Sequence, residues 1–229
     1  MGEEVRLTAQ DGHVLDAYRA SPSGTPAGGV VIVQEVFGLT PHVRSVVERY
    51  AAEGFAAIAP AMFDRVERGL VLDYSELERG LATMRQLEWP QTLADVQAAI
   101  DALGEVPVGV VGFCWGGTVA HVAACELPVS AAVSYYGSGI VRMLDKRPKC
   151  PVLYHFGDRD QSIPPESIER IRQANPTGIY HIYAGAGHGF DSEGRASFSP
   201  EDSALAFSRS VAFLREHLRA ASMPPYTPS

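Results

Sequence analysis

The sequence predicts an α/β domain in which helices cover both faces of a doubly wound, mostly parallel sheet. Six short apolar runs have the composition of strands buried on both faces, which is typical of parallel sheets. Amphipathic stretches with helical spacing alternate with these runs along the chain. A glycine-flanked turn joins one such run to a helical segment at residues 112–117. Together these patterns favour a single α/β domain.

The strands are expected in the apolar, β-branched runs of the chain. Their ranges are 30–34, 56–59, 108–111, 131–135, 151–156 and 179–183. A helix should begin at Thr40 and Pro41 and stop at Gly54, because its apolar residues recur at helical spacing between them.

Two further helices follow from the same reasoning. Thr92 is the expected N-cap of a helix that stops at Gly104 and has its apolar positions at Val96, Ala99 and Ile100. The last helix should span about 200–221. Its expected buried residues are Phe207, Val211, Leu214 and Leu218.

Composition limits the classes of function. The 229 residues are 46% hydrophobic and 20% charged, which suits one globular domain over 1–222 followed by a flexible, Pro-rich tail at 223–229. The net charge of −8 argues against nucleic acid or an anionic membrane as a partner. We expect no secretory signal, no membrane span and no disulfide framework from three cysteines. A cytoplasmic monomer is the expectation.

The turn at 112–117 carries the chemistry. Its sequence GFCWGG places Cys114 between two glycines at the junction of a strand and a helix. This is the layout of a nucleophile elbow, in which a strained turn exposes one side chain above the sheet. Cysteine stands where most such turns carry serine. A buried, inert cysteine in a Gly-rich turn is the alternative.

Two later loops supply partners for a nucleophile. Asp160 follows the strand at 151–156, and His188 lies in a Gly-rich loop after the strand at 179–183. A histidine can stabilise a thiolate, and a carboxylate can fix the tautomer of that histidine. Asp158 is a rival for the acid, since either aspartate could instead cap the following helix.

The remaining cysteines and histidines have simpler explanations. Cys125 and Cys150 have no catalytic setting, and we expect both to be structural. Core or surface packing is expected for His121, His155 and His181. No cluster has the spacing of metal ligands, so neither a metal nor another cofactor is expected.

Four stretches together resemble the dienelactone hydrolase family of the α/β-hydrolase superfamily. They are QEVFG at 34–38, GFCWGG at 112–117, GDRDQSIP at 157–164 and GAGHGF at 185–190. The resemblance covers about residues 5–220 and implies a triad of Cys114, Asp160 and His188. It also implies that Glu35 is the buried glutamate that contacts the resting thiol and helps to generate the thiolate.

The family's archetype opens cyclic enol-lactones that carry a carboxylate, so the resemblance implies an arginine-lined, anionic-substrate pocket. Guanidinium groups bind carboxylates through paired hydrogen bonds. Arg65 and Arg195 lie in segments similar to the family's, and Phe37 is a further expected substrate-binding residue. Arg79 and Arg85 are alternatives on the helix at 75–88. The archetype's arginine four residues after the catalytic histidine is Ser192 here.

The expected function is therefore cysteine-dependent opening of enol-lactones through an acyl-enzyme on Cys114. Backbone N–H groups of Trp115 and Val36 would hold the oxyanion. A carboxylesterase or thioesterase of the same fold, with a different ester substrate, is the alternative. A second alternative is a redox role, in which Cys114 is a reversibly oxidised sensor thiol.

Overall fold

The computed structural model describes residues 2–218. Its eight strands form one sheet in the order β1-β2-β4-β3-β5-β6-β7-β8. The strands are β1 (Glu3–Thr8), β2 (Val14–Ala20), β3 (Gly29–Val33), β4 (Ala56–Pro60), β5 (Val108–Phe113), β6 (Ala131–Tyr135), β7 (Val152–Gly157) and β8 (Ile179–Tyr183). All pairs from β4 to β8 are parallel, whereas β1 pairs with β2 and β2 with β4 in antiparallel fashion. The doubly wound α/β prediction is confirmed.

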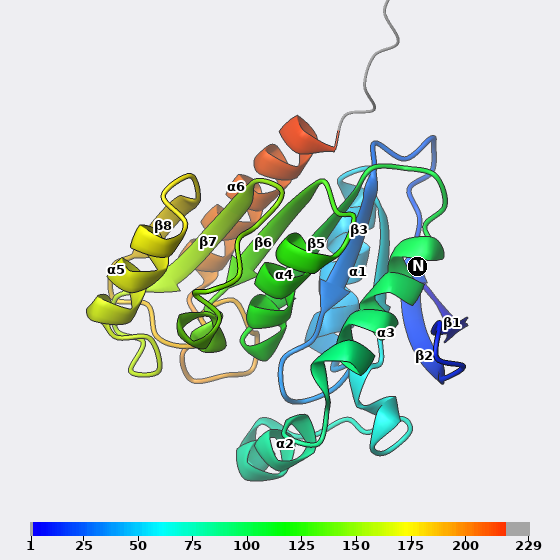
Figure 1. Ribbon diagram of the computed structural model, residues 1–229, viewed down its shortest axis with the longest axis horizontal. Coiled ribbons are helices and arrows are strands. Elements are labelled where there is room, and N and C mark those ends of the chain that lie inside the picture. Colours follow the sequence, from blue (N-terminus) through cyan, green and yellow to red (C-terminus); the bar gives the residue numbers. More distant parts are fainter. Residues whose placement is uncertain (1, 219–229) are drawn as a thin grey trace, which may run out of the picture.

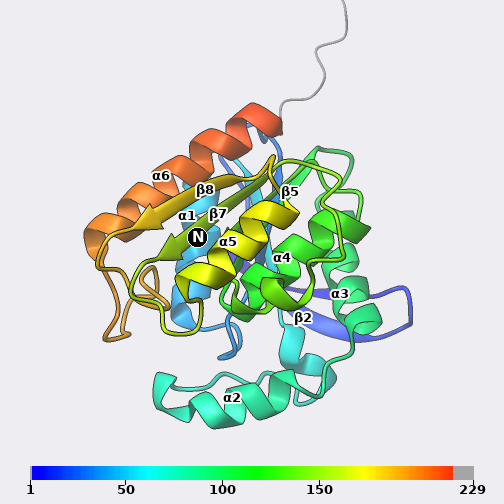
Figure 2. The same cartoon turned by 60° about the vertical axis from the view of Figure 1, so that its left-hand side comes forward.

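The helices lie on both faces of this sheet. They are α1 (Pro41–Ala52), α2 (Leu77–Met84), α3 (Trp89–Asp101), α4 (Trp115–Glu126), α5 (Pro165–Ala174) and α6 (Pro200–His217), with short 3-10 helices η1 (Met62–Arg65), η2 (Tyr74–Glu76) and η3 (Ser138–Arg142). Helices α3, α4 and α5 cover one face, and α1 and α6 cover the other (Figure 1). Helix α2 lies apart from both layers, beside the edge where the strands end (Figure 2).

Buried strands explain this layering. Along β3, Val30 and Ile32 enter the core shared with α1 and α6, whereas Val31 and Val33 enter the core shared with α3 and α4. Successive side chains of a strand point to opposite faces, so a strand covered on both sides is apolar throughout. The six predicted strands all form, within a residue or two of the expected bounds.

Two sequence-based expectations differ from the structure. The antiparallel strands β1 and β2 were not expected, because both are partly exposed and carry charged residues, so neither is a continuous apolar run. Helix α3 begins at Trp89 rather than at Thr92, with Glu88 as its N-cap. Pro90 accounts for the earlier start, since its fixed φ suits the first turn of a helix. The expected end of α6 at residue 221 and the tail at 223–229 lie outside the described residues. No described helix has both the length and the apolarity needed to cross a membrane.

Candidate active site

Cys114 occupies a strained turn between β5 and α4. Its backbone has φ 56° and ψ −116°, in the left-handed range that ordinary residues rarely adopt. A Cβ on Gly112 would lie 1.8 Å from the carbonyl oxygen of Gly116, and one on Gly116 would lie 2.3 Å from that of Val33. The close crossing of strand and helix therefore requires both glycines, and it directs the thiol away from the sheet.

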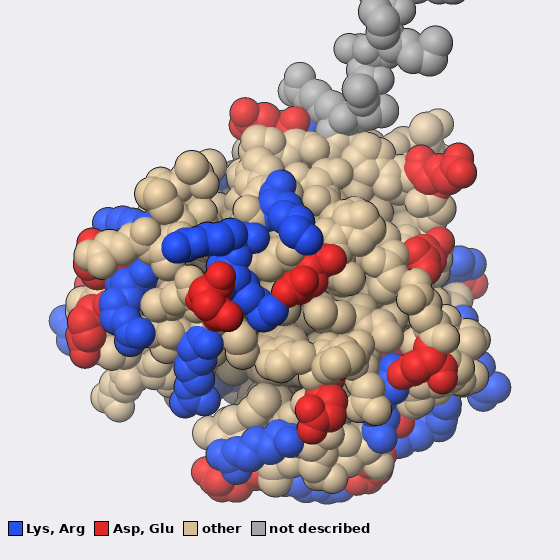
Figure 3. All heavy atoms as spheres, viewed as in Figure 1, with Lys and Arg blue, Asp and Glu red and all other residues tan. Residues whose placement is uncertain are grey.

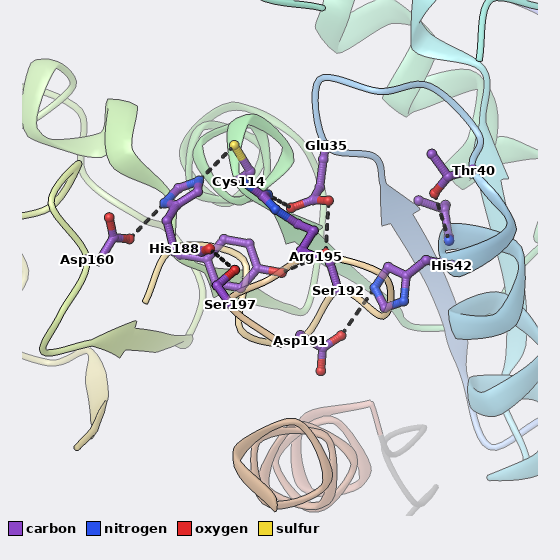
Figure 4. A network of polar contacts seen from close by, with 12 residues as sticks. Glu35, Thr40, His42, Cys114, Asp160, His188, Asp191, Ser192, Arg195 and Ser197 are labelled. Atoms are coloured by element: carbon purple, nitrogen blue, oxygen red, sulfur yellow. Dashed lines mark hydrogen bonds and ion pairs between the residues drawn. The ribbon is translucent and has the colours of Figure 1, made fainter. Parts of the chain in front are cut away.

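Asp160, His188 and Cys114 form a continuous line of polar contacts at the ends of β7, β8 and β5 (Figure 4). Nδ1 of His188 is 2.7 Å from Oδ2 of Asp160, and its Nε2 is 3.1 Å from Sγ of Cys114. The Asp160 side chain is fully buried, and its Oδ1 accepts the N–H of Ser162 at 2.8 Å. These distances are those of a nucleophile, a base and an orienting acid.

Asp158 has a different environment. Its side chain is exposed, and its Oδ1 accepts the N–H of Gly185 at 2.6 Å. It fixes the turn before the histidine loop rather than contacting His188. The structure therefore brings Asp160, of the two aspartates, to the histidine.

Buried hydrogen bonds hold a proton on His188. Burial disfavours the charged ring, but the hydrogen bonds to Asp160 and Cys114 outweigh this and raise the pKa of His188 to about 10. A protonated ring between a carboxylate and a thiol stabilises negative charge on the sulfur. The hydroxyl of Ser197 donates to the carbonyl oxygen of His188 at 2.6 Å, which fixes the backbone of this residue.

Glu35 lies beside this line and contacts a different set of groups. Its Oε1 accepts from Nη1 of Arg195 at 3.0 Å, and its Oε2 accepts from the hydroxyl of Ser192 at 2.9 Å. The side chain is almost fully buried, so its charge requires such partners. In this arrangement the thiol of Cys114 contacts His188, whereas the resemblance implied a contact between the thiol and Glu35.

A second buried histidine ties the His188 loop to α1. Nε2 of His42 lies 3.4 Å from Oδ2 of Asp191. The hydroxyl of Ser203 donates to the other oxygen of this carboxylate, Oδ1 of Asp191, at 2.7 Å. Neither His42 nor Asp191 was singled out in the sequence. The position of Asp191, three residues after His188, is the one signal that could have identified it.

The arginines expected to bind substrate are occupied elsewhere. Nε and Nη2 of Arg65 each donate to a carboxylate oxygen of Asp95 at 2.7 Å, and Nη1 lies 2.8 Å from Asp11. The predicted substrate-binding role of Arg65 is corrected to a structural one, because two carboxylates fill its donor fork. Arg195 is paired with Glu35, and its guanidinium lies 5.6 Å from the ring centre of Phe37. Phe37 is 1% exposed and packs edge-on against Tyr74 rather than lining a cavity.

A cavity of about 570 Å³ opens beside the thiol. Its lining residues are Val36, Leu81, Met84, Arg85, Leu87, Trp89, Thr92, Cys114, Trp115, Thr118, Ser138, Gly139, Val141, Arg142, Met143 and Ser162. Both residues expected to form the oxyanion hole, Val36 and Trp115, are among them. Trp115 is the first residue of α4, where backbone N–H groups have no acceptor within the helix. The N–H of Trp115 can therefore serve a ligand beside Sγ.

Arg142 is a lining residue that the sequence reasoning missed. It ends η3, the short helix that follows β6. Functional residues gather beyond the carboxyl ends of parallel strands, and this rule points to the segment after β6. Within residues 2–218 there is no group of three His, Cys, Asp or Glu side chains that could hold a metal ion.

Comparison with known proteins gives the family of this chain. The model of the "Dienelactone hydrolase family" matches residues 15–218. The chain belongs to the dienelactone hydrolase family. It is therefore a hydrolase that acts on carboxylic ester or lactone bonds.

Several relatives cover nearly the whole chain. The carboxymethylenebutenolidase of Pseudomonas putida is 33% identical over 225 residues, which are 93% of this chain and 95% of the relative. A crystal structure assigned as a dienelactone hydrolase, from Klebsiella pneumoniae, has a TM-score of 0.81 at 30% identity and covers 93% of this chain and 97% of its own. An esterase from Pyrococcus furiosus, 16% identical with a TM-score of 0.70, shares the fold and covers 95% of this chain and 92% of its own.

Proposed function

We propose that this member of the dienelactone hydrolase family opens enol-lactones through a covalent acyl-enzyme on Cys114. The observation that carries the proposal is the unbroken line from Asp160 through His188 to the sulfur of Cys114, at 2.7 and 3.1 Å. Thiolates attack carbonyl carbons, and a protonated histidine beside the sulfur favours the thiolate. The substrate is a small ester or lactone that carries a carboxylate.

The first half of the reaction acylates the enzyme. The Cys114 thiolate attacks the carbonyl carbon, a C–S bond forms, and the negative charge moves to the carbonyl oxygen. The N–H groups of Trp115 and Val36 stabilise that oxyanion. The C–O bond to the leaving oxygen then breaks, and His188 gives its proton to the departing enolate. In a lactone the leaving group remains attached to the acyl chain.

The second half releases the acid. Acylation removes the negative charge from the sulfur, so one of the two interactions that hold the proton on His188 is lost. The neutral ring takes a proton from water, and the resulting hydroxide attacks the thioester carbon. The C–S bond breaks, the carboxylic acid leaves, and the thiolate is restored beside protonated His188. Asp160 keeps Nε2 directed at the reacting atoms throughout.

Glu35 is proposed to control this nucleophile indirectly. Its two oxygens are held by Arg195 and Ser192, and this leaves the thiol to His188. A rotation of Glu35 toward Sγ would place a second negative charge beside the thiolate and disfavour it. The Arg195 contact therefore supports the reactive form of Cys114.

The test is hydrolysis of a cis- or trans-dienelactone beside p-nitrophenyl acetate, by purified protein with and without iodoacetamide. Lactone opening that iodoacetamide abolishes, with slow cleavage of the simple ester, is the expected result. The Cys114→Ala variant should be inactive, whereas Cys150→Ala should keep its activity. Lactone opening by Cys114→Ala would overturn the mechanism.

A carboxylesterase with another ester substrate is the second candidate. The observation that favours it is the group of apolar side chains that line the cavity beside the thiol, among them Leu81, Leu87 and Val141. Thiol-dependent cleavage of p-nitrophenyl acetate without opening of either dienelactone would select this candidate and retain the role of Cys114.

A further inference from the structure

The charge of the catalytic cavity comes from two arginines. Of its lining residues within the described chain, only Arg85 and Arg142 are charged. Arg85 caps the C-terminal end of α2, and Arg142 is the last residue of η3. Two distant segments of the chain thus place guanidinium groups on one cavity that contains no carboxylate.

Neither guanidinium has an acidic partner. Among the ion pairs of residues 2–218, none within 4.0 Å includes Arg85 or Arg142. Arg79, one turn and a half earlier on α2, instead contacts Glu67 and Glu76. Arg85 and Arg142 therefore keep their hydrogen-bond donors for a ligand.

Several apolar side chains line the cavity together with these arginines, beside hydroxyl groups of Thr118, Ser138 and Ser162. Leu81, Met84 and Leu87 come from the α2 region, and Val141 and Met143 flank Arg142. Such a lining favours a hydrocarbon or aromatic body, because burying it there removes apolar surface from water. An anionic group at the far end of that body would reach the guanidinium groups.

A hydrogen bond to α4 holds η3, the short helix that carries Arg142, at the cavity. The N–H of Gly139 donates to the hydroxyl of Thr118 on α4 at 3.0 Å, which ties η3 to the helix that begins beside Cys114. The backbone of η3 is therefore tied to that helix, and the exposed side chain of Arg142 extends from its last residue.

The surrounding surface adds to the attraction. Residues 142–149 hold Arg142, Lys146, Arg147 and Lys149 against one acid in the same segment, Asp145, while Lys146 also pairs with Glu126 of α4. Blue side chains gather over α4 and α5 in the view of Figure 3, and more lie over α2. A local positive field beside a binding cavity raises the association rate of anions.

We propose that Arg85 and Arg142 form the carboxylate-binding end of the cavity and select amphipathic esters in which an apolar acyl chain separates the scissile carbonyl from a terminal carboxylate. This inference rests on the proposed function of Cys114. It assigns the anion to arginines other than Arg65 and Arg195, which the structure shows to be paired. It also predicts a substrate longer than a compact lactone carboxylate.

The test compares p-nitrophenyl half-esters of dicarboxylic acids with neutral alkyl esters of equal chain length. Short half-esters are left out, because their free carboxylate attacks the ester of the same molecule and releases p-nitrophenol without the enzyme. The wild type should show a higher kcat/KM for the anionic ester at one or more lengths, and that advantage should shrink as salt screens the charges. The chain length with the largest advantage reports the span from Sγ to the guanidinium groups.

Variants assign the effect to residues. Arg85→Gln and Arg142→Gln should each raise KM for the preferred anionic ester by about tenfold, the effect of one lost charge-assisted hydrogen bond. Any change in KM for the neutral ester of equal length should be several-fold smaller, so that the preference of each variant for the anionic ester falls. Arg79→Gln is the matched control on α2, and it should leave both substrates unaffected because its partners lie outside the cavity.

Two outcomes would overturn the inference. One is equal kcat/KM for anionic and neutral esters at every length in the wild type. The other is an anionic preference that survives in the double variant of Arg85 and Arg142. In either case, cleavage of the neutral ester that Cys114→Ala abolishes would leave the proposed function intact. Retained cleavage by Cys114→Ala would instead show that the proposed function itself has failed.

Discussion

Replacement of Arg65 by Met separates a structural role from a substrate-binding one. The change keeps the length and apolar stem of the side chain but removes two hydrogen bonds of 2.7 Å to Asp95. The side chain of Asp95 is 1% exposed, so its carboxylate would remain buried without a cation. Loss of one partner from a buried pair costs about 3–5 kcal/mol of unfolding free energy. The added contact with the more exposed Asp11 contributes little.

In a domain of this length, each kcal/mol lowers the melting temperature by roughly 2–4 °C. We therefore expect Arg65→Met to melt about 6–20 °C below the wild type in calorimetry. Below that temperature, its KM for the anionic substrate should equal that of the wild type. Arg6→Met is the control, because Arg6 is exposed and its 3.5 Å ion pair with Asp16 should contribute under about 1 kcal/mol.

The double variant Arg65→Met/Asp95→Leu tests the cause of the instability. Burial raises the pKa of Asp95 despite the opposing hydrogen bonds of Arg65, which indicates that desolvation of this carboxylate is expensive. Removing both charges should therefore restore most of the lost stability. The deficit of the single variant should shrink as the pH falls, because protonation relieves the unpaired charge. An unchanged melting temperature together with a raised KM would refute the structural assignment.

Three further predictions concern the catalytic line. Gly116→Ala would place a Cβ 2.3 Å from the carbonyl oxygen of Val33, so strand and helix must separate by about 1 Å. We expect the free energy of unfolding in urea to fall by about 1–3 kcal/mol and kcat to fall about 100-fold. Gly24→Ala is the control, because a Cβ on Gly24 meets no atom within 4 Å, and it should have no effect. Asp160→Asn should lower kcat by at least about 100-fold in a protein that still folds, since Asn cannot fix the charged ring of His188; wild-type kcat would contradict this. The folded pKa of His188 is raised from 6.5 to about 10, so its contribution to stability is complete below pH 6.5 and is lost as the pH rises through about 10. Urea unfolding of wild type and His188→Gln at several pH values should show a difference that narrows toward pH 10, and a widening difference would exclude the raised pKa.

The sequence was most informative where the structure depends on local patterns. Apolar β-branched runs buried on both faces predicted the six central strands, because neither face of such a strand has to be polar. The partly exposed strands β1 and β2, at one end of the sheet, lack that signal. The end of each parallel strand is also a local feature, and this is why Cys114, Asp160 and His188 could be placed at one edge of the sheet from their order alone.

What the sequence by itself determined is therefore the α/β fold, the strained turn at Cys114 and the three side chains of the catalytic line. Only the tertiary structure decided which arginines are available to a substrate. Arg65 meets Asp95, thirty residues away, and Arg195 meets Glu35 from the other end of the chain. Arg85 and Arg142 line the cavity, and within residues 2–218 neither has a carboxylate oxygen within 4.0 Å. A guanidinium is a ligand site or a structural cation according to its neighbours in space, and those neighbours are distant in the sequence.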